Sequence, residues 1–207
     1  MSKVWFITGA SRGIGAEIAK AALASGDRVV ATGRNRAQIE KTFAGNASVL
    51  AVELDVTDAA QAHRAVDAAL AKFGRIDVLV NNAGSSFKGY FEEMSPGQVD
   101  AQLATNLVGP MNLTRAVLPV MRRQRGGRIF NLSSMAGVLG FASASIYCST
   151  KFAIEGFSES LALEVAQFGI SRSRSSSRAS SAPTSWTPAP SATAPRWSMT
   201  TSPPRPS

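Results

Sequence analysis

The sequence is poor in the residues that build metal, disulfide and imidazole-based sites. It has one cysteine, Cys148, and one histidine, His63, among 207 residues. A lone cysteine excludes a disulfide framework, a four-thiolate zinc site and a Cys-x-x-Cys redox centre, and a lone histidine excludes a site that needs two imidazoles. We therefore expect no metal site.

Membrane and secretion signals are also missing. No apolar run approaches the roughly 18 residues of a transmembrane helix, and the first residues do not follow a signal-peptide pattern. The default expectation is a soluble cytoplasmic protein that binds no membrane.

The net charge of +8 is unevenly distributed along the chain. Residues 171–207 contain five arginines and no acidic residue, which leaves 17 basic and 14 acidic side chains in residues 1–170. Because residues 1–170 are close to balanced, the charge does not indicate nucleic-acid binding.

Residues 1–170 alternate short apolar runs with amphipathic stretches. The apolar runs predict strands at Lys3–Thr8, Arg28–Gly33, Ser48–Leu54, Asp77–Asn81 and Arg128–Leu132. The amphipathic stretches predict helices at Gly13–Ser25, Arg36–Phe43, Asp58–Phe73, Ser95 to about Gln124, and Ile146–Phe168, with Ser95 as an N-cap and Pro96 in the first turn. Strands separated by helices imply parallel β-α-β units, hence an α/β fold with a Rossmann-like, doubly wound parallel sheet of about five strands.

Residues 171–207 have a different composition, with 12 Ser, 7 Pro, 5 Thr and 5 Ala but no Val, Ile, Leu or Phe. Such a segment cannot bury enough apolar surface to offset its ordering entropy. We expect a folded domain over 1–170 and a disordered tail over 171–207.

The glycine-rich segment Thr8–Gly15 lies between the first predicted strand and the first predicted helix. Glycines there allow backbone N–H groups to close on a pyrophosphate, although a tight connection needs glycines too. The same letters spell Gly-x-Ser-x-Gly, the nucleophile elbow of hydrolases. That interpretation requires a catalytic histidine, and His63 falls inside a predicted helix, so we reject it.

The end of the second strand bears on the choice of dinucleotide. Sites that select NAD place a carboxylate there against the ribose 2′-hydroxyl, whereas this sequence has Gly33-Arg34. Arg34 and Arg12 can instead clamp a 2′-phosphate, which favours NADP(H) and leaves NAD(H) as the alternative. Solvated surface arginines would explain the same residues.

Tyr147 and Lys151 are spaced i, i+4 on the last predicted helix, so their side chains share a face. A nearby ammonium favours tyrosinate and makes a tyrosine a better acid–base catalyst. Ser133 and Ser134 follow the fifth strand, at the sheet edge where α/β proteins bind ligands. Taken alone, the Tyr–Lys spacing is also common on ordinary helix surfaces.

Together these segments resemble the short-chain dehydrogenase/reductase family. The shared motifs are Thr-Gly-x-x-x-Gly-x-Gly at Thr8–Gly15, Asp55-Val56, Asn81-Asn82-Ala83-Gly84, and Tyr147-x-x-x-Lys151 with a serine thirteen residues before the tyrosine. Their order and spacing agree with the family over residues 1–170.

The resemblance implies roles for individual residues. Tyr147 would be the general acid/base, Lys151 would hold the nicotinamide ribose and favour tyrosinate, and Ser134 would hydrogen-bond the substrate oxygen. Asp55 and Val56 would meet the adenine, and Asn82, Ala83 and Gly84 would line the adenosine ribose. The implied catalytic set is Asn106, Ser134, Tyr147 and Lys151. The implied cofactor set is Gly9, Ser11, Arg12, Gly13, Ile14, Gly15, Arg34, Asp55, Val56, Asn82, Ala83, Gly84, Tyr147 and Lys151.

Asn106 matches the catalytic asparagine of the family. Pro110 has no N–H, so the Asn106 carbonyl loses its helical partner and can hold a water that links Lys151 to solvent. An ordinary proline kink is the alternative.

These assignments imply an oxidoreductase that transfers a hydride between NADP(H) and a secondary alcohol, ketone or aldehyde. The alternative is a non-catalytic nucleotide-binding protein or an inactive, truncated member of the family. A homo-oligomer, dimer or tetramer, is expected through the helices over 95–124 and 146–168. Phe87, Phe91, Met135 and Phe141 are candidates for lining the substrate pocket, although core packing explains apolar residues equally well.

The sequence departs from the family after Ile170, where the family continues with a strand, a Pro-Gly turn, a substrate lid and a seventh strand. Reading the tail one base out of frame permits Val-Thr-Ile-Val-Glu-Pro-Gly over Ser173–Ala179. We therefore hypothesise a frameshift near codon 170, with an evolved disordered tail as the alternative. Without the family's last strands, the fifth strand is expected to have an unpaired edge, and this chain to have much reduced or no turnover.

Overall fold

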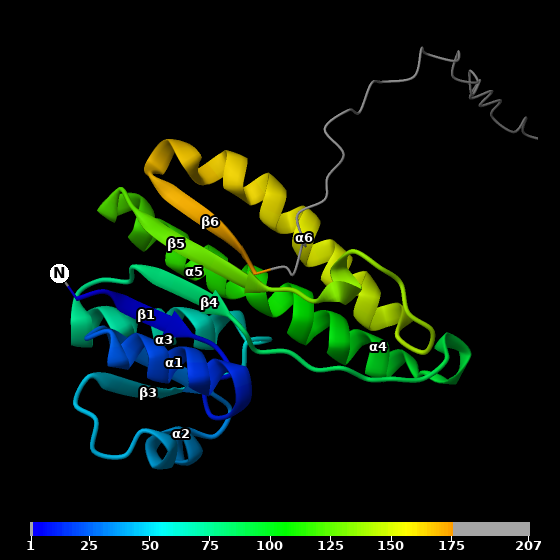
Figure 1. Cartoon of the computed structure of the whole chain (residues 1–207), viewed down its shortest axis with the longest axis horizontal. Coiled ribbons are helices and arrows are strands. Elements are labelled where there is room, and N and C mark those ends of the chain that lie inside the picture. The colour runs from blue at the N-terminus through cyan, green and yellow to red at the C-terminus, as the bar shows by residue number, and fades with distance from the viewer. Residues whose placement is uncertain (1, 176–207) are drawn as a thin grey trace, which may run out of the picture. The chain divides into compact units, whose positions relative to one another are not determined.

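The computed structural model describes residues 2–175 of the chain, which form a parallel sheet covered by helices (Figure 1). The strands are β1 (Val4–Ile7), β2 (Arg28–Gly33), β3 (Val49–Glu53), β4 (Val78–Asn81), β5 (Gly127–Leu132) and β6 (Ile170–Ser175). The α-helices are α1 (Gly13–Ala24), α2 (Arg36–Thr42), α3 (Ala59–Phe73), α4 (Pro96–Leu103), α5 (Gly109–Gln124) and α6 (Ser145–Val165). Short 3₁₀ turns occur at η1 (Phe91–Glu93), η3 (Met135–Gly137) and η4 (Ala166–Phe168), and a π-helical turn at η2 (Ala104–Val108).

All the strands of the sheet are parallel, in the order β3-β2-β1-β4-β5-β6. One buried cluster joins the sheet to α1 and α2, and another joins it to α3, α5 and α6. Helices on both faces of a parallel sheet confirm the predicted Rossmann-like α/β fold.

The strand order reverses at β1, which pairs with β2 on one side and β4 on the other. In open α/β sheets, ligands bind beyond the carboxyl ends of the strands at such a reversal. This arrangement brings the segments that follow Ile7 and Asn81 to the same point of the sheet edge.

The sheet has one more strand than the sequence predicts. β6 pairs with β5 in parallel from Gly127↔Ile170 to Leu132↔Ser175, so the expectation of an unpaired β5 edge is wrong. Gly169, at φ +70°, reverses the chain after α6, and Ile170 is buried in the core. Apolar content missed this strand because backbone groups form the ladder whatever the side chains are, and a polar sequence suits an edge strand.

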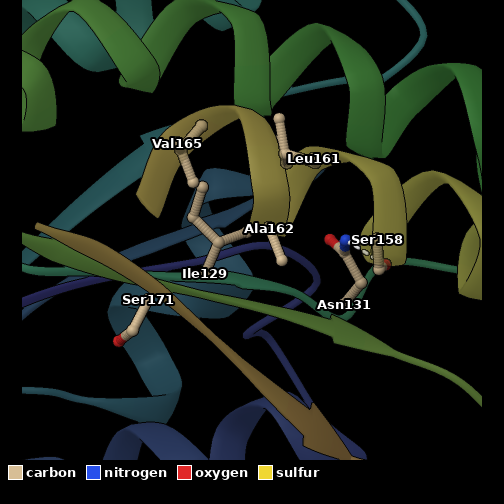
Figure 2. Close-up of a pocket in the computed structure, with 7 residues that line it drawn as sticks. All are labelled: Ile129, Asn131, Ser158, Leu161, Ala162, Val165 and Ser171. Carbon is tan, nitrogen blue, oxygen red and sulfur yellow. Dashed lines mark hydrogen bonds between the residues drawn. The ribbon is translucent and has the colours of Figure 1, made fainter. Parts of the chain in front are cut away.

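A small cavity lies between α6 and the last two strands (Figure 2). Its volume is about 10 Å³, close to the space that one water molecule occupies. Its lining is Ile129, Asn131, Ser158, Leu161, Ala162, Val165 and Ser171. The predicted disordered tail began at residue 171, and residues 171–175 belong to β6. The rest of that tail, and the predicted change of reading frame from residue 176 on, lie outside the described residues.

The predicted helix over Ser95 to Gln124 is interrupted. Ser95 is the N-cap, with its hydroxyl accepting from the Gln98 N–H, and Pro96 occupies the first turn, as predicted. The helix then widens into the π turn η2, just before Pro110. Because Pro110 has no N–H to donate, the regular helical ladder cannot continue through this point.

No helix within residues 2–175 is long and apolar enough to cross a membrane. The described residues also contain no cluster of three or more His, Cys, Asp or Glu side chains placed to hold a metal ion.

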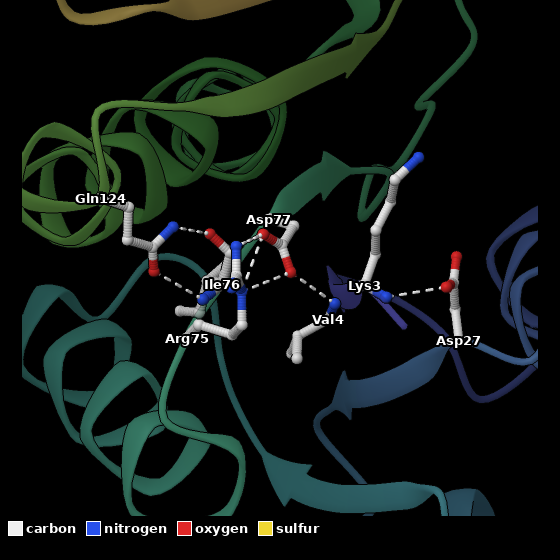
Figure 3. Close-up of polar contacts among 7 residues, drawn as sticks. All are labelled: Lys3, Val4, Asp27, Arg75, Ile76, Asp77 and Gln124. Atoms are coloured by element: carbon white, nitrogen blue, oxygen red, sulfur yellow. Dashed lines mark hydrogen bonds and ion pairs between the residues drawn. The ribbon is translucent and has the colours of Figure 1, made fainter. Parts of the chain in front are cut away.

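Polar side chains close the amino-terminal edge of the sheet (Figure 3). The Gln124 side chain pairs with the backbone of Ile76, accepting from its N–H at 3.1 Å and donating to its carbonyl at 2.8 Å. The Asp77 carboxylate accepts from the Val4 N–H at 2.8 Å and forms an ion pair with Arg75. These contacts join α5, β4 and β1.

Replacing Gln124 with alanine is expected to destabilise the fold by about 2 kcal/mol, because two backbone groups of the fully buried Ile76 lose their partners. Urea denaturation measures the change. Gln167→Ala is the matched control, because that exposed amide makes only a local bond to Glu164, and its effect should stay within about 0.5 kcal/mol. Equal effects of the two substitutions would contradict this assignment.

Candidate functional site

The turn after β1 is locked to the turn after β4 through Thr8. The buried Thr8 hydroxyl accepts from the N–H groups of Asn82 at 3.0 Å and Ala83 at 2.9 Å. The Asn82 amide donates back to the carbonyls of Thr8 at 2.8 Å and Gly9 at 3.1 Å. Thr8 and the Asn82 side chain therefore shape the turn itself, a role that sequence reasoning did not assign to either residue.

Two glycines are required by this close contact. A Cβ at Gly9 would lie 3.0 Å from the Ala83 Cα, and Gly9 has φ +66°. A Cβ at Gly15 would clash with the Asn82 amide nitrogen and lie 2.5 Å from the Gly9 carbonyl oxygen. A side chain at either position would push the turn after β1 away from the turn after β4.

The start of α1 is open toward the sheet edge. Its N-cap, Arg12, makes no capping hydrogen bond, and the first turn of α1 has no acidic residue. Gly13, at φ +59°, has open space where a Cβ would be. Ile14 is exposed, while Ser11 is partly covered and its carbonyl accepts from Thr42. Free N–H groups at a helix N-terminus suit a pyrophosphate, so the residues present fit the phosphates of a dinucleotide.

Arg12 and Arg34 are both exposed, and neither forms an ion pair within residues 2–175. Arg34 directly follows β2, next to the buried Gly33. Arg36, by contrast, is already paired with Glu40 at 2.7 Å. Arg12 and Arg34 are therefore available to an anion at this end of the site.

Asp55 and Val56 come shortly after β3. Their contact with the adenine, which the family resemblance implies, stays a prediction. One Asp55 carboxylate oxygen accepts from the N–H and the hydroxyl of Thr57, at 2.9 and 2.8 Å. Val56 is buried. A Cβ at Gly109 would lie 2.6 Å from a methyl carbon of Val56, so a side chain at that position would clash with it. The position of Val56 thus depends on a glycine at the start of α5.

Tyr147 and Lys151 lie one turn apart on α6. The Lys151 ammonium donates to the Leu132 carbonyl at 2.7 Å and lies 5.7 Å from the centre of the Tyr147 ring. Burial lowers the pKa of the Lys151 ammonium, and the Glu155 carboxylate partly opposes that shift. The arrangement places a partly desolvated cation against the face of the tyrosine.

The two serines after β5 differ in their surroundings. Ser134 caps η3, with its hydroxyl accepting from the Ala136 N–H at 3.2 Å. The Ser133 hydroxyl is buried with no hydrogen-bond partner among the described residues. Gly137 packs tightly here, since a Cβ would lie 2.6 Å from the Ser133 oxygen and 3.0 Å from the Lys151 carbonyl. This contact holds η3 against the turn of α6 that carries Lys151.

Asn106 is buried in the π turn and connects the segment after β4 to α6. Its side-chain oxygen accepts from the Ser85 N–H at 2.8 Å. Its amide donates to the Ser85 carbonyl at 2.8 Å and to the Thr150 hydroxyl at 3.3 Å. A Cβ at Gly84 would lie 3.3 Å from the Asn106 oxygen. The proposed water site at the Asn106 backbone carbonyl stays a prediction.

Four apolar residues that the sequence assigned either to the lining of the substrate pocket or to the core are not buried. Phe87, Phe91, Met135 and Phe141 are exposed, by 36%, 64%, 52% and 47% respectively. Core packing therefore does not explain them.

His63, the residue that a hydrolase mechanism would have required, lies on α3 with its side chain exposed.

The structure gathers the predicted residues into two groups at the carboxyl edge of the sheet. Thr8–Gly15 and Asn82–Gly84 form one group, and Asn106 and α6 meet in the other. The roles of the individual residues stay predictions. Sequence reasoning missed Thr150 and Ser85 because their importance comes from contacts with Asn106, which is distant in the chain.

Comparison with known proteins agrees with this arrangement. Residues 3–174 match the family model for short chain dehydrogenases. The chain is 46% identical over 172 residues to an oxidoreductase, BOA17, of Botryotinia fuckeliana, covering 82% of this chain and 63% of that protein. It is 40% identical over 168 residues to a 3-ketodihydrosphingosine reductase of Bacteroides thetaiotaomicron, covering 81% of this chain and 60% of the relative.

A solved short-chain dehydrogenase from Streptomyces avermitilis has the same fold, with a TM-score of 0.81 and 43% identity. The match covers 84% of this chain and 64% of that structure. The chain therefore spans less than two thirds of the length of these relatives. With a family model that matches nearly all of the described residues, the chain belongs to the short-chain dehydrogenase family.

Proposed function

We propose that this chain carries the site of a reversible hydride transfer between NADP(H) and a secondary alcohol, ketone or aldehyde, with Tyr147 as the proton carrier. The observation that carries the proposal is the Tyr147–Lys151 pair, fixed by the bond from Lys151 to the Leu132 carbonyl. Membership of a dehydrogenase family supports a nicotinamide cofactor.

A nicotinamide cofactor held at the start of α1 and by Arg12 and Arg34 would supply the hydride in reduction and take it up in oxidation. During reduction, the Tyr147 hydroxyl donates its proton to the substrate oxygen, and during oxidation tyrosinate takes the proton back. The Lys151 ammonium lies 5.7 Å from the centre of the Tyr147 ring, so it places a positive charge beside the group that exchanges the proton. The Ser134 hydroxyl, whose oxygen accepts from the Ala136 N–H, keeps its own proton free to donate to the substrate oxygen.

Asn106 acts in this scheme by positioning. It holds the Ser85 backbone against Thr150, and the Thr150 hydroxyl in turn donates to the Tyr147 carbonyl at 2.8 Å. This route connects the segment after β4 to the turn of α6 that carries Tyr147.

The preference for NADP(H) is proposed from the charges around the end of β2. Arg12 and Arg34 are exposed and without ion pairs in the described part of the chain, and no carboxylate follows Gly33 directly. Guanidinium groups suit a 2′-phosphate, whereas an NAD site needs an acceptor for the 2′-hydroxyl.

The second candidate is a nucleotide-binding protein without turnover. The chain covers 63% of the oxidoreductase BOA17 and 60% of the 3-ketodihydrosphingosine reductase, so the activity of these whole relatives does not by itself transfer to it. NADPH binding without reduction of any carbonyl would identify this alternative.

We also propose a homo-oligomer through α5 and α6. The two helices form an open surface groove of about 350 Å³. Apolar residues of the groove include Met111, Leu118 and Phe157, and its charged residues carry both signs. A surface of this composition can pair with a second copy of itself.

Replacing Tyr147 with phenylalanine is expected to lower the single-turnover rate of ketone reduction, which the sequence predicts to be slow in this chain, about 100-fold or more, because the proton donor is lost. The affinity for NADPH should change little. Single-turnover oxidation of NADPH, followed by absorbance with the protein in excess, measures the rate, and calorimetry measures the affinity. Retained activity in this variant would remove Tyr147 from the proposed role.

Replacing Arg34 with alanine is expected to weaken NADPH binding about tenfold or more and to leave NADH binding nearly unchanged, because a charge-assisted contact to the 2′-phosphate is lost. Calorimetric titration with both nucleotides tests this. Arg64→Ala, which removes an exposed cation on α3, is the matched control. A parallel loss for both nucleotides would argue against recognition of the 2′-phosphate.

Replacing Lys151 with methionine is expected to stabilise the fold near neutral pH, because burial of the ammonium lowers its pKa in the folded state. Between the lowered value and the ordinary value of about 10.4, the unfolded chain holds a proton that the folded chain has released. The wild-type protein therefore gains stability as pH rises through this window, and the advantage of Lys151→Met shrinks. Urea denaturation of both proteins from neutral to alkaline pH measures it, and a difference independent of pH would contradict the assignment.

A further inference from the structure

Large apolar side chains are exposed in the segment after β4 and in the segment between β5 and α6, the helix that carries Tyr147 and Lys151. Tyr90 and Phe91 lie in the segment after β4, exposed by 62% and 64%. Met135, Val138, Leu139 and Phe141 lie between β5 and α6, and each is at least 40% exposed. We call these six residues the apolar rim. Exposed apolar clusters of this kind mark surfaces that bind ligands or partners.

The two parts of the rim are joined by a backbone hydrogen bond. The Gly89 N–H donates to the Ser143 carbonyl at 3.0 Å, so the segment with Tyr90 and Phe91 lies beside the segment with Phe141. Ser143 adopts φ +59°, an unfavourable conformation for serine that the fold maintains at this contact. The bond makes one surface from two distant parts of the chain.

The rim is continuous with the catalytic site. Met135 directly follows Ser134, and η3 is held against α6 where Gly137 packs on the Lys151 carbonyl. On the other side, the Phe87 N–H donates to the buried Gln102 side chain, and Ser85 is held by Asn106. The rim therefore begins next to Ser134 and continues along the segment that leads into α6.

The two segments that carry the rim contain few charged side chains. Residues 133–150 contain no charged side chain, and residues 82–95 contain only Lys88, Glu92 and Glu93. Glu93 is bonded to the Tyr90 N–H at 3.2 Å. This set has no excess of positive charge for a carboxylate or phosphate. An uncharged molecule is the one that this surface suits.

We propose that the apolar rim binds the hydrocarbon chain of an uncharged ketone substrate, while Tyr147 and Ser134 hold the carbonyl oxygen. The inference rests on the proposed function for the reacting end and adds the class of substrate, a ketone with a long alkyl chain. Each methylene that the rim covers strengthens binding about two- to fourfold.

The test measures equilibrium binding of methyl ketones from butanone to decanone to the full chain saturated with NADPH. Affinity is expected to rise about two- to fourfold with each methylene. The double variant Phe91→Ser and Phe141→Ser should flatten this rise and leave NADPH binding unchanged. Leu163→Ser, which removes an apolar residue of α6 that is 83% exposed and outside the rim, is the matched control and should keep the rise.

Three results would overturn the inference: no rise in affinity with chain length, tighter binding of a keto acid than of the matched ketone, or a change of oligomeric state in the double variant without a change in ketone binding. The last result would make the rim a contact between copies of the chain. Because binding is measured without turnover, a rise in affinity without any ketone reduction would count against the proposed function alone. Reduction with no dependence on chain length would count against the rim alone.

Discussion

The hydrogen bonds between Thr8 and the Asn82–Ala83 turn are the constraint on which the rest of the site depends. The Thr8 hydroxyl accepts two N–H groups, and the Asn82 amide returns two bonds to the turn after β1. Because β1 and β4 are neighbours at the reversal of strand order, these bonds set the gap beyond the sheet edge. Gly9 and Gly15 keep this gap narrow, since neither position has room for a side chain.

A second set of polar contacts carries this geometry across the sheet to α6. Asn81 donates to Asn131 at 2.8 Å, and Asn131 donates to Ser158 on α6 at 2.8 Å. Asn106 makes the parallel connection to Thr150. Buried networks of this kind fix relative positions, because leaving one partner unpaired costs free energy. The position of α6, which carries Tyr147, is thus tied to β4 and β5 and to the π turn η2.

Sequence reasoning predicted the parts of this architecture that local pattern determines. The strand and helix order, the cap at Ser95 and the glycine turn all follow from periodicity and turn chemistry. It missed β6, because the ladder with β5 is made by backbone groups in a segment without apolar character. It also predicted one helix where Pro110 produces a π turn. Exposure of Phe91 and its neighbours depends on contacts between distant segments, which no local pattern reports.

The central claim is that Tyr147 and Lys151 serve hydride transfer to a carbonyl, and transfer of isotope tests it most directly. The full chain, in excess over NADPH deuterated at the transferable position, is incubated with decanone, and the alcohol product is examined by mass spectrometry. The account predicts deuterium on the carbinol carbon of the product. Saturable NADPH binding with no labelled alcohol after prolonged incubation would contradict it and would leave a nucleotide-binding protein without turnover.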